Sequence, residues 1–143
     1  MAEEQQATAG MRVISPADWG VDQGLLGGGT WREIVGPGIG SECRGLYDLQ
    51  FAQEGRSVIL THDSEAAYYV VAGTGTVEHA DGEQSHELTD GSMVHVRPGT
   101  PYRLTGAAGT RLVGGPCPAT SSITGAPVHP AAATDLWPAV SLS

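Results

Sequence analysis

The sequence contains no lysine, and its 7 basic residues are all arginines scattered along 143 positions. Asp and Glu together number 16, which gives a formal net charge of −9. Nucleic acids and anionic membrane surfaces are bound by clusters of basic side chains, and this chain has no such cluster. The charge pattern therefore argues against a nucleic acid or a membrane as partner.

Long apolar runs and paired cysteines are also missing. No stretch approaches the roughly 20 apolar residues that cross a bilayer, and residues 1–10 lack the charged-then-apolar order of a secretory signal. Cys43 and Cys117 stand far apart without a CxxC spacing, so we expect reduced thiols. These absences predict a cytoplasmic protein, and the length fits a single domain.

Helical periodicity is nearly absent, whereas turn-forming glycine (21) and proline (9) are frequent. Short apolar or alternating segments lie between the turns, and Tyr47, Leu49 and Phe51 illustrate the period of two that is typical of strands. The segments that we predict as strands are 30–35, 43–52, 56–62, 66–73, 76–80, 85–88, two within 93–104, and 110–115. Eight or nine short strands predict an antiparallel sandwich or barrel, with one helical turn near Ser15.

Composition changes towards both ends of the chain. We predict a flexible N-terminal tail over residues 1–11, a barrel over 12–115 and an extended C-terminal tail over 116–143. The last of these segments is rich in Pro, Ala, Ser and Thr and has little periodicity.

Two stretches resemble the motifs of the cupin family. Residues 62–77, HDSEAAYYVVAGTGTV, resemble the second half of the first cupin motif, and residues 91–104, GSMVHVRPGTPYRL, resemble the second. The resemblance implies an all-β fold, a cupin-type jelly-roll barrel of short antiparallel strands that commonly dimerises. It also implies a metal site built from two His and one Glu of the first motif and one His of the second.

This chain departs from the family at those ligand positions, which fall on Leu60, His62, Ala66 and Tyr102. Only His62 keeps the family's donor, and a first-row metal needs about three converging N, O or S donors. Glu65 is one residue away from the expected Glu position, and adjacent strand residues face opposite sides. We therefore expect neither a metal nor another cofactor.

The remaining residues favour a metal-independent cupin that binds a small organic molecule in its barrel. If the protein is an enzyme, His62 and Tyr102 are the expected catalytic acid–base pair of an isomerase, epimerase or cyclase. The predicted ligand-binding residues are Leu60, Glu65, Ala66, Tyr68 and His95. The sequence leaves open which face of strand 93–96 points inward.

Two alternatives are a non-catalytic binding or sensing module, and a metal-dependent oxygenase that uses His62, His95 and Glu65. We also expect a homodimer, because strand 66–72 is apolar on both faces and Tyr69 and Val71 would point outward.

Several polar residues receive no role at this level. His79 and His86 flank the Asp81-Gly82 turn and are expected to be solvated. Arg97 and Arg103 are expected to be exposed charges.

Overall fold

The computed structural model describes residues 10–36 and 45–117 of the chain. Its strands are β1 (Leu26–Val35), β2 (Leu46–Ser57), β3 (Glu65–Ala72), β4 (Gly75–His79), β5 (Ser85–Leu88), β6 (Met93–Val96), β7 (Tyr102–Gly106) and β8 (Arg111–Cys117). One 3-10 turn, η1 (Pro16–Asp18), follows Ser15 as expected. Within these residues no helix is long and apolar enough to cross a membrane. The predicted all-β fold is confirmed.

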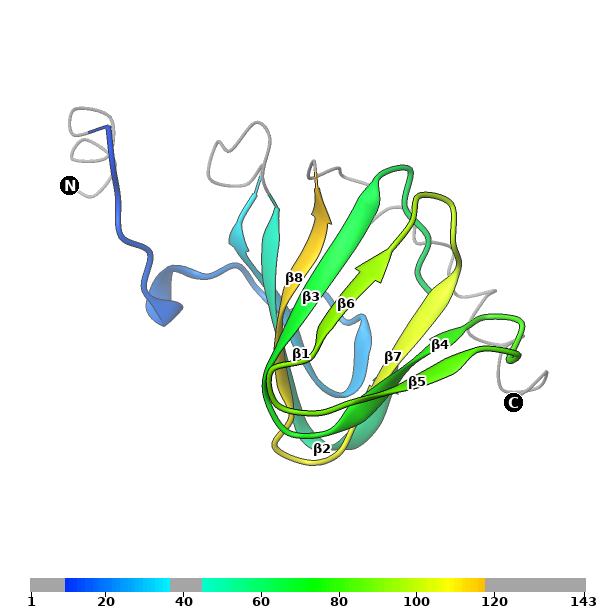
Figure 1. Cartoon of the computed structure of the whole chain (residues 1–143). Helices are drawn as coiled ribbons and strands as arrows, with labels where there is room; N and C mark the ends of the chain where they lie inside the picture. Colours follow the sequence, from blue (N-terminus) through cyan, green and yellow to red (C-terminus); the bar gives the residue numbers. More distant parts are fainter. Residues whose placement is uncertain (1–9, 37–44, 118–143) are drawn as a thin grey trace.

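The strands form one antiparallel sheet in the order β5-β4-β7-β2-β8-β3-β6, with β1 paired to β2. Strand β2 joins the two halves, because residues 47–50 pair with β8 whereas residues 55–56 pair with β7. The sheet curls into a nearly closed barrel (Figure 1). In the described part of the chain no ladder joins β5 to β6, so the barrel has an open seam between these two strands.

Alternation along β3 separates the barrel interior from its surface. Ala66, Tyr68 and Val70 are buried, whereas Tyr69 and Val71 are 44% and 40% exposed. This is the inward and outward parity that the sequence predicts.

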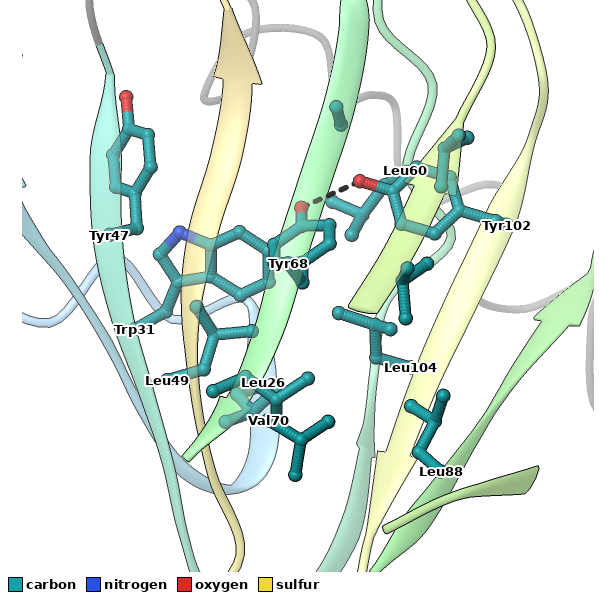
Figure 2. Close-up of a cluster of buried hydrophobic side chains, with 14 of the residues drawn as sticks. Leu26, Trp31, Tyr47, Leu49, Leu60, Tyr68, Val70, Leu88, Tyr102 and Leu104 are labelled. Atoms are coloured by element: carbon teal, nitrogen blue, oxygen red, sulfur yellow. Dashed lines mark hydrogen bonds between the residues drawn. The ribbon is translucent and has the colours of Figure 1, made fainter. Parts of the chain in front are cut away.

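The buried side chains fall into two layers. Aliphatic residues fill one end of the interior, and aromatic rings with hydroxyl groups lie towards the other (Figure 2). The labelled residues of the aliphatic end are Leu26, Leu49, Val70, Leu88 and Leu104, and the tyrosines are Tyr47, Tyr68 and Tyr102, with Leu60 beside Tyr102.

The segment 56–62, predicted as a strand of its own, is the main error of the element assignment. Strand β2 continues through Ser57, and the following residues make only an isolated bridge between Leu60 and Tyr102. Ile59 and Leu60 are buried, so their apolar character reflects burial in the core rather than a full strand ladder.

Gly114 sets the spacing of the strands that carry two of the tyrosines. It pairs with Tyr47 of β2 on one side and with Tyr68 of β3 on the other. Its φ is +153°, and a side-chain carbon at this position would overlap the carbonyl oxygen of Ala67. Only glycine allows this close approach, so Gly114 holds the backbones of Tyr47 and Tyr68 at a fixed spacing on either side of β8.

Arg103 was expected to be exposed, yet it is buried at 1% relative exposure. Burial, together with the charge of Arg56 and against the opposing charge of Glu78, lowers the pKa of its guanidinium to about 10. The outward parity of this side chain was therefore not a sufficient reason to predict exposure.

The predicted tails 1–11 and 116–143 fall mostly outside the described residues, and so does Cys43. The division of the chain into a barrel and two tails therefore stays a prediction.

We propose that the outward face of β3 and β6 forms the interface of a homodimer. Tyr69 pairs in register with Met93, which is 66% exposed, and Val71 extends the apolar surface. We expect light scattering to give roughly twice the chain mass of 14.7 kDa, because covering this face removes apolar surface from water. The double variant Tyr69→Glu, Met93→Glu should give the mass of one chain with an unchanged far-UV circular dichroism spectrum. A single-chain mass for the wild type across a wide concentration range would contradict the expectation.

Candidate ligand-binding site

The backbone brings His62 next to Tyr102, although they are 40 residues apart. Leu60 and Tyr102 exchange two hydrogen bonds, with N···O distances of 2.8 and 2.9 Å. Two residues further along, the N–H of Gly99 donates to the carbonyl oxygen of His62 at 2.8 Å. On the opposite side Tyr102 pairs with His79 of β4. Tyr102 is therefore held by neighbours on both sides at the start of β7.

Three buried side chains form a hydrogen-bonded chain around the Tyr102 hydroxyl. The Tyr102 oxygen lies 2.7 Å from His62 Nε2 and 2.6 Å from the Tyr68 hydroxyl oxygen. Figure 2 shows the two tyrosine hydroxyls pointing toward each other across the interior. His62, Tyr68 and Tyr102 are 3%, 0% and 1% exposed, so each polar group depends on its neighbour rather than on solvent.

Burial keeps this chain uncharged near neutral pH. Desolvation lowers the pKa of His62 to about 4, and the charge of Asp63 only partly opposes this. Desolvation also raises the pKa of Tyr102 well above its usual value, and the neighbouring Tyr68 adds to the increase. The pKa of Tyr68 is likewise raised by burial. A neutral imidazole therefore faces two neutral phenols.

The buried nitrogen atoms that have no hydrogen-bond partner within the described ranges include His62 Nδ1 and Trp31 Nε1. Trp31 packs against Tyr68, with ring centroids 6.2 Å apart, and against Tyr47 at 6.3 Å. An unpaired buried polar group costs about 1–3 kcal/mol. Atoms of this kind mark positions where a bound molecule with oxygen or nitrogen atoms would find partners.

Apolar side chains complete the wall around the polar chain. Leu60 and Ala66, which occupy two of the family's metal-ligand positions, are buried at 0% and 1% exposure. Val94 and Val96 of β6 are also buried, and they pair with Tyr68 and Ala66. The interior therefore combines one polar chain with an apolar surround, which suits an organic molecule more than an ion.

Five predicted site residues thus come together in the interior, whereas His95 and Glu65 lie on the outer face of the barrel. The structure settles the face of β6, because the two valines point inward and His95 points out. His95 Nε2 contacts Glu65 Oε1 at 2.6 Å on the barrel surface, and the two side chains are 60% and 59% exposed. These two predicted ligand-binding residues therefore do not lie beside His62 in the interior.

The same geometry bears on metal binding. The alternative ligand set of His62, His95 and Glu65 is divided between the interior and the surface. Over residues 10–36 and 45–117, no three His, Cys, Asp or Glu side chains are grouped to hold a metal ion. The residues at the family's ligand positions do not fit a metal, and no step of the chemistry below uses one.

A cavity of about 400 Å³ lies at the open seam and reaches this site. It is lined by residues of β4 and β5 on one side, by residues of β6 on the other, and by Tyr102. His79 and His86, to which the sequence assigned no role, belong to this lining. A larger cavity of about 550 Å³ is lined by Glu54, Thr76 and Thr105 among others and includes no member of the hydrogen-bonded chain.

Comparison with known proteins agrees with this architecture. The family model described as cupin domain matches residues 49–113. Among solved structures, the polyketide cyclase RemF from Streptomyces resistomycificus is 19% identical, with a TM-score of 0.61 over 75% of this chain and 80% of that one. An RmlC-like cupin from Shewanella frigidimarina is 18% identical, with a TM-score of 0.62 over 78% of this chain and 96% of that one.

A cupin-like protein from Thermotoga maritima is 19% identical, with a TM-score of 0.55 over 72% of this chain and 74% of that one. No curated protein sequence matches the chain. The family-model match and the cupin folds of these solved structures support a cupin family protein, as the two sequence motifs indicated.

The low pKa of His62 predicts a specific dependence of stability on pH. Because the folded-state pKa of about 4 lies below the ordinary value of 6.5, the unfolded chain binds more protons between these values. Stability due to His62 is therefore complete above pH 6.5 and is lost as the pH falls toward 4, by at most about 3 kcal/mol.

We expect urea unfolding between pH 7 and pH 4.5 to show a steeper loss for the wild type than for His62→Gln. Parallel pH profiles for the two proteins would mean that His62 is solvated in the folded state.

Proposed function

We propose that this cupin binds a small organic molecule at the tyrosine end of its barrel without a metal. We further propose that His62 and Tyr102 move a proton within it, as in an isomerisation or a cyclisation. The observation that carries the proposal is the buried chain Tyr68–Tyr102–His62, with Nδ1 of His62 left unpartnered. A polyketide cyclase among the structural neighbours supports it at the level of the fold alone.

The hydrogen-bond geometry suggests how the proton would move. If His62 Nε2–H and the Tyr68 hydroxyl both donate to the Tyr102 oxygen, the Tyr102 proton is free to donate to a substrate carbonyl. That hydrogen bond strengthens as negative charge develops on the carbonyl oxygen. Nδ1 of the same imidazole is then an acceptor and takes a proton from the carbon beside the carbonyl. In an isomerisation the proton returns from Nδ1 to a different carbon. In a cyclisation the enolate carbon attacks a second carbonyl carbon of the same molecule, and the oxygen of that carbonyl takes the proton from Nδ1.

The pKa of His62 limits the substrates that this chemistry allows. A base with a pKa of about 4 is weak, so the carbon acid must itself be activated. Protons on a carbon between an aromatic ring and a carbonyl group, or between two carbonyl groups, meet this condition. We therefore propose an aromatic or polycarbonyl compound as the substrate class.

Non-catalytic binding or sensing is the second candidate, and one observation favours it. Burial moves the pKa of His62 down and that of Tyr102 up, which makes proton transfer between neutral groups less favourable. The same side chains would then recognise an oxygen atom of a ligand without reacting with it.

Exchange of the carbon-bound protons of 2-tetralone with deuterium oxide, followed by proton NMR, measures the enolisation that isomerases and cyclases share. We expect the wild type to accelerate this exchange. Loss of a positioned acid–base group lowers rates by about 10²–10⁴, so His62→Gln and Tyr102→Phe should each lose most of the acceleration. Tyr47→Phe is the matched control, since Tyr47 is buried but lies outside the hydrogen-bonded chain.

Other outcomes of this experiment are equally informative. Binding of 2-tetralone without exchange, weakened by about 0.5–1.5 kcal/mol in Tyr102→Phe, would favour the binding module. Exchange and binding that are unchanged in both His62→Gln and Tyr102→Phe would show that the site has been assigned to the wrong residues.

A further inference from the structure

The open seam of the barrel carries a groove whose lining is chemically uneven. Its buried residues are Val94, Val96 and Tyr102, which form an apolar inner part ending at a phenol. The more exposed residues of its lining include three histidines and Arg97. The groove is thus apolar inside and rich in nitrogen donors outside.

Histidines are concentrated at this groove. Of the four histidines in the described residues, His79, His86 and His95 line it. The fourth, His62, is hydrogen-bonded to Tyr102, which lines it as well. In a chain with a net charge of −9, the lining of this cavity is thus unusual in holding several nitrogen donors, one arginine and only one acidic residue.

Some of these donors have no protein partner. Nδ1 of His79 accepts a hydrogen bond from the backbone N–H of Asp81 at 3.1 Å, and His95 contacts Glu65. Among residues 10–36 and 45–117, neither the guanidinium of Arg97 nor the imidazole of His86 has a hydrogen-bond or ion-pair partner. The acidic residue in the lining, Glu78, accepts a hydrogen bond from the Thr76 hydroxyl at 3.2 Å. Arg97 and His86 are therefore available to a bound anion.

The turn after β6 places Arg97 in a fixed relation to the interior site. The N–H of Thr100 donates to the carbonyl oxygen of Arg97 at 3.2 Å, which closes the turn. Within the same turn, the N–H of Gly99 donates to the carbonyl oxygen of His62. The groove rim and the buried imidazole are thus joined through one short piece of backbone.

We infer that the seam groove binds an organic carboxylate, with its carboxylate group at Arg97 and His86 and its apolar body against Val94 and Val96. A guanidinium binds a carboxylate through two parallel hydrogen bonds, which makes arginine the suited residue at such a rim. A volume of about 400 Å³ lies within the usual range for small-molecule sites. One part of this inference rests on the proposed function, namely that the far end of the ligand presents an oxygen atom to Tyr102. The recognition of the carboxylate by Arg97 is independent of the proposed function.

Three related probes separate these two parts. 6-Hydroxy-2-naphthoate carries both a carboxylate and a distal hydroxyl, 2-naphthoate lacks the hydroxyl, and 6-hydroxy-2-naphthamide lacks the charge. We expect calorimetric titration of the full chain to give at least tenfold tighter binding of 6-hydroxy-2-naphthoate than of the amide. Arg97→Gln should remove that preference, and His86→Gln should reduce it. Arg56→Gln, which removes an exposed arginine of β2 outside the groove, should leave it intact.

Equal affinity for the acid and the amide would overturn the inference, and so would a preference that survives Arg97→Gln. If neither naphthoate binds at millimolar concentration, the inference is overturned too. The Tyr102 end is tested separately, because Tyr102→Phe should weaken 6-hydroxy-2-naphthoate but leave 2-naphthoate unchanged. If Arg97 controls binding and Tyr102→Phe changes neither naphthoate, carboxylate recognition stands and the proposed function fails.

Discussion

The hydroxyl of Tyr102 bonds to both His62 and Tyr68, and the polar end of the barrel depends on this arrangement. Three polar side chains are stable in an apolar interior only when each satisfies the next. Their positions follow from the backbone, through the bridge of Leu60 to Tyr102 and through Gly114, which sets the spacing at Tyr68. A change that moves any of these strands would leave buried polar atoms unpaired.

Burial decides the chemistry that this end of the barrel can perform. It keeps the imidazole of His62 and both phenols neutral, so the site offers hydrogen bonds and a weak base rather than fixed charges. Charge is available instead at the seam, where Arg97 lines the groove. Leu60 and Ala66 add apolar surface where the family places metal ligands. This division fits a ligand that places a charged end at the seam and an uncharged end in the interior.

Local sequence patterns predicted the strands, because a period of two is a property of neighbouring residues, and the inward direction of Tyr68 followed once the family motifs indicated which face is the interior. The family motifs predicted that His62 and Tyr102 would meet. Sequence could not predict the burial of Arg103, nor that His79 and His86 line one groove together with residues of β6. Both features depend on how strands that are distant in sequence come together in space. The segment 56–62 was misread as a strand, since burial and strand pairing produce the same apolar pattern.

The imidazole nitrogens of His62 give the most direct test of the account. Their ¹⁵N chemical shifts, measured in the free protein and with 6-hydroxy-2-naphthoate, report charge and hydrogen bonding at each nitrogen separately. The account predicts a neutral ring from pH 5 to pH 8, with Nε2 hydrogen-bonded and Nδ1 shifting only when the ligand is added. A ring that gains its proton near pH 6.5, with an Nδ1 shift that does not respond to the ligand, would contradict the account.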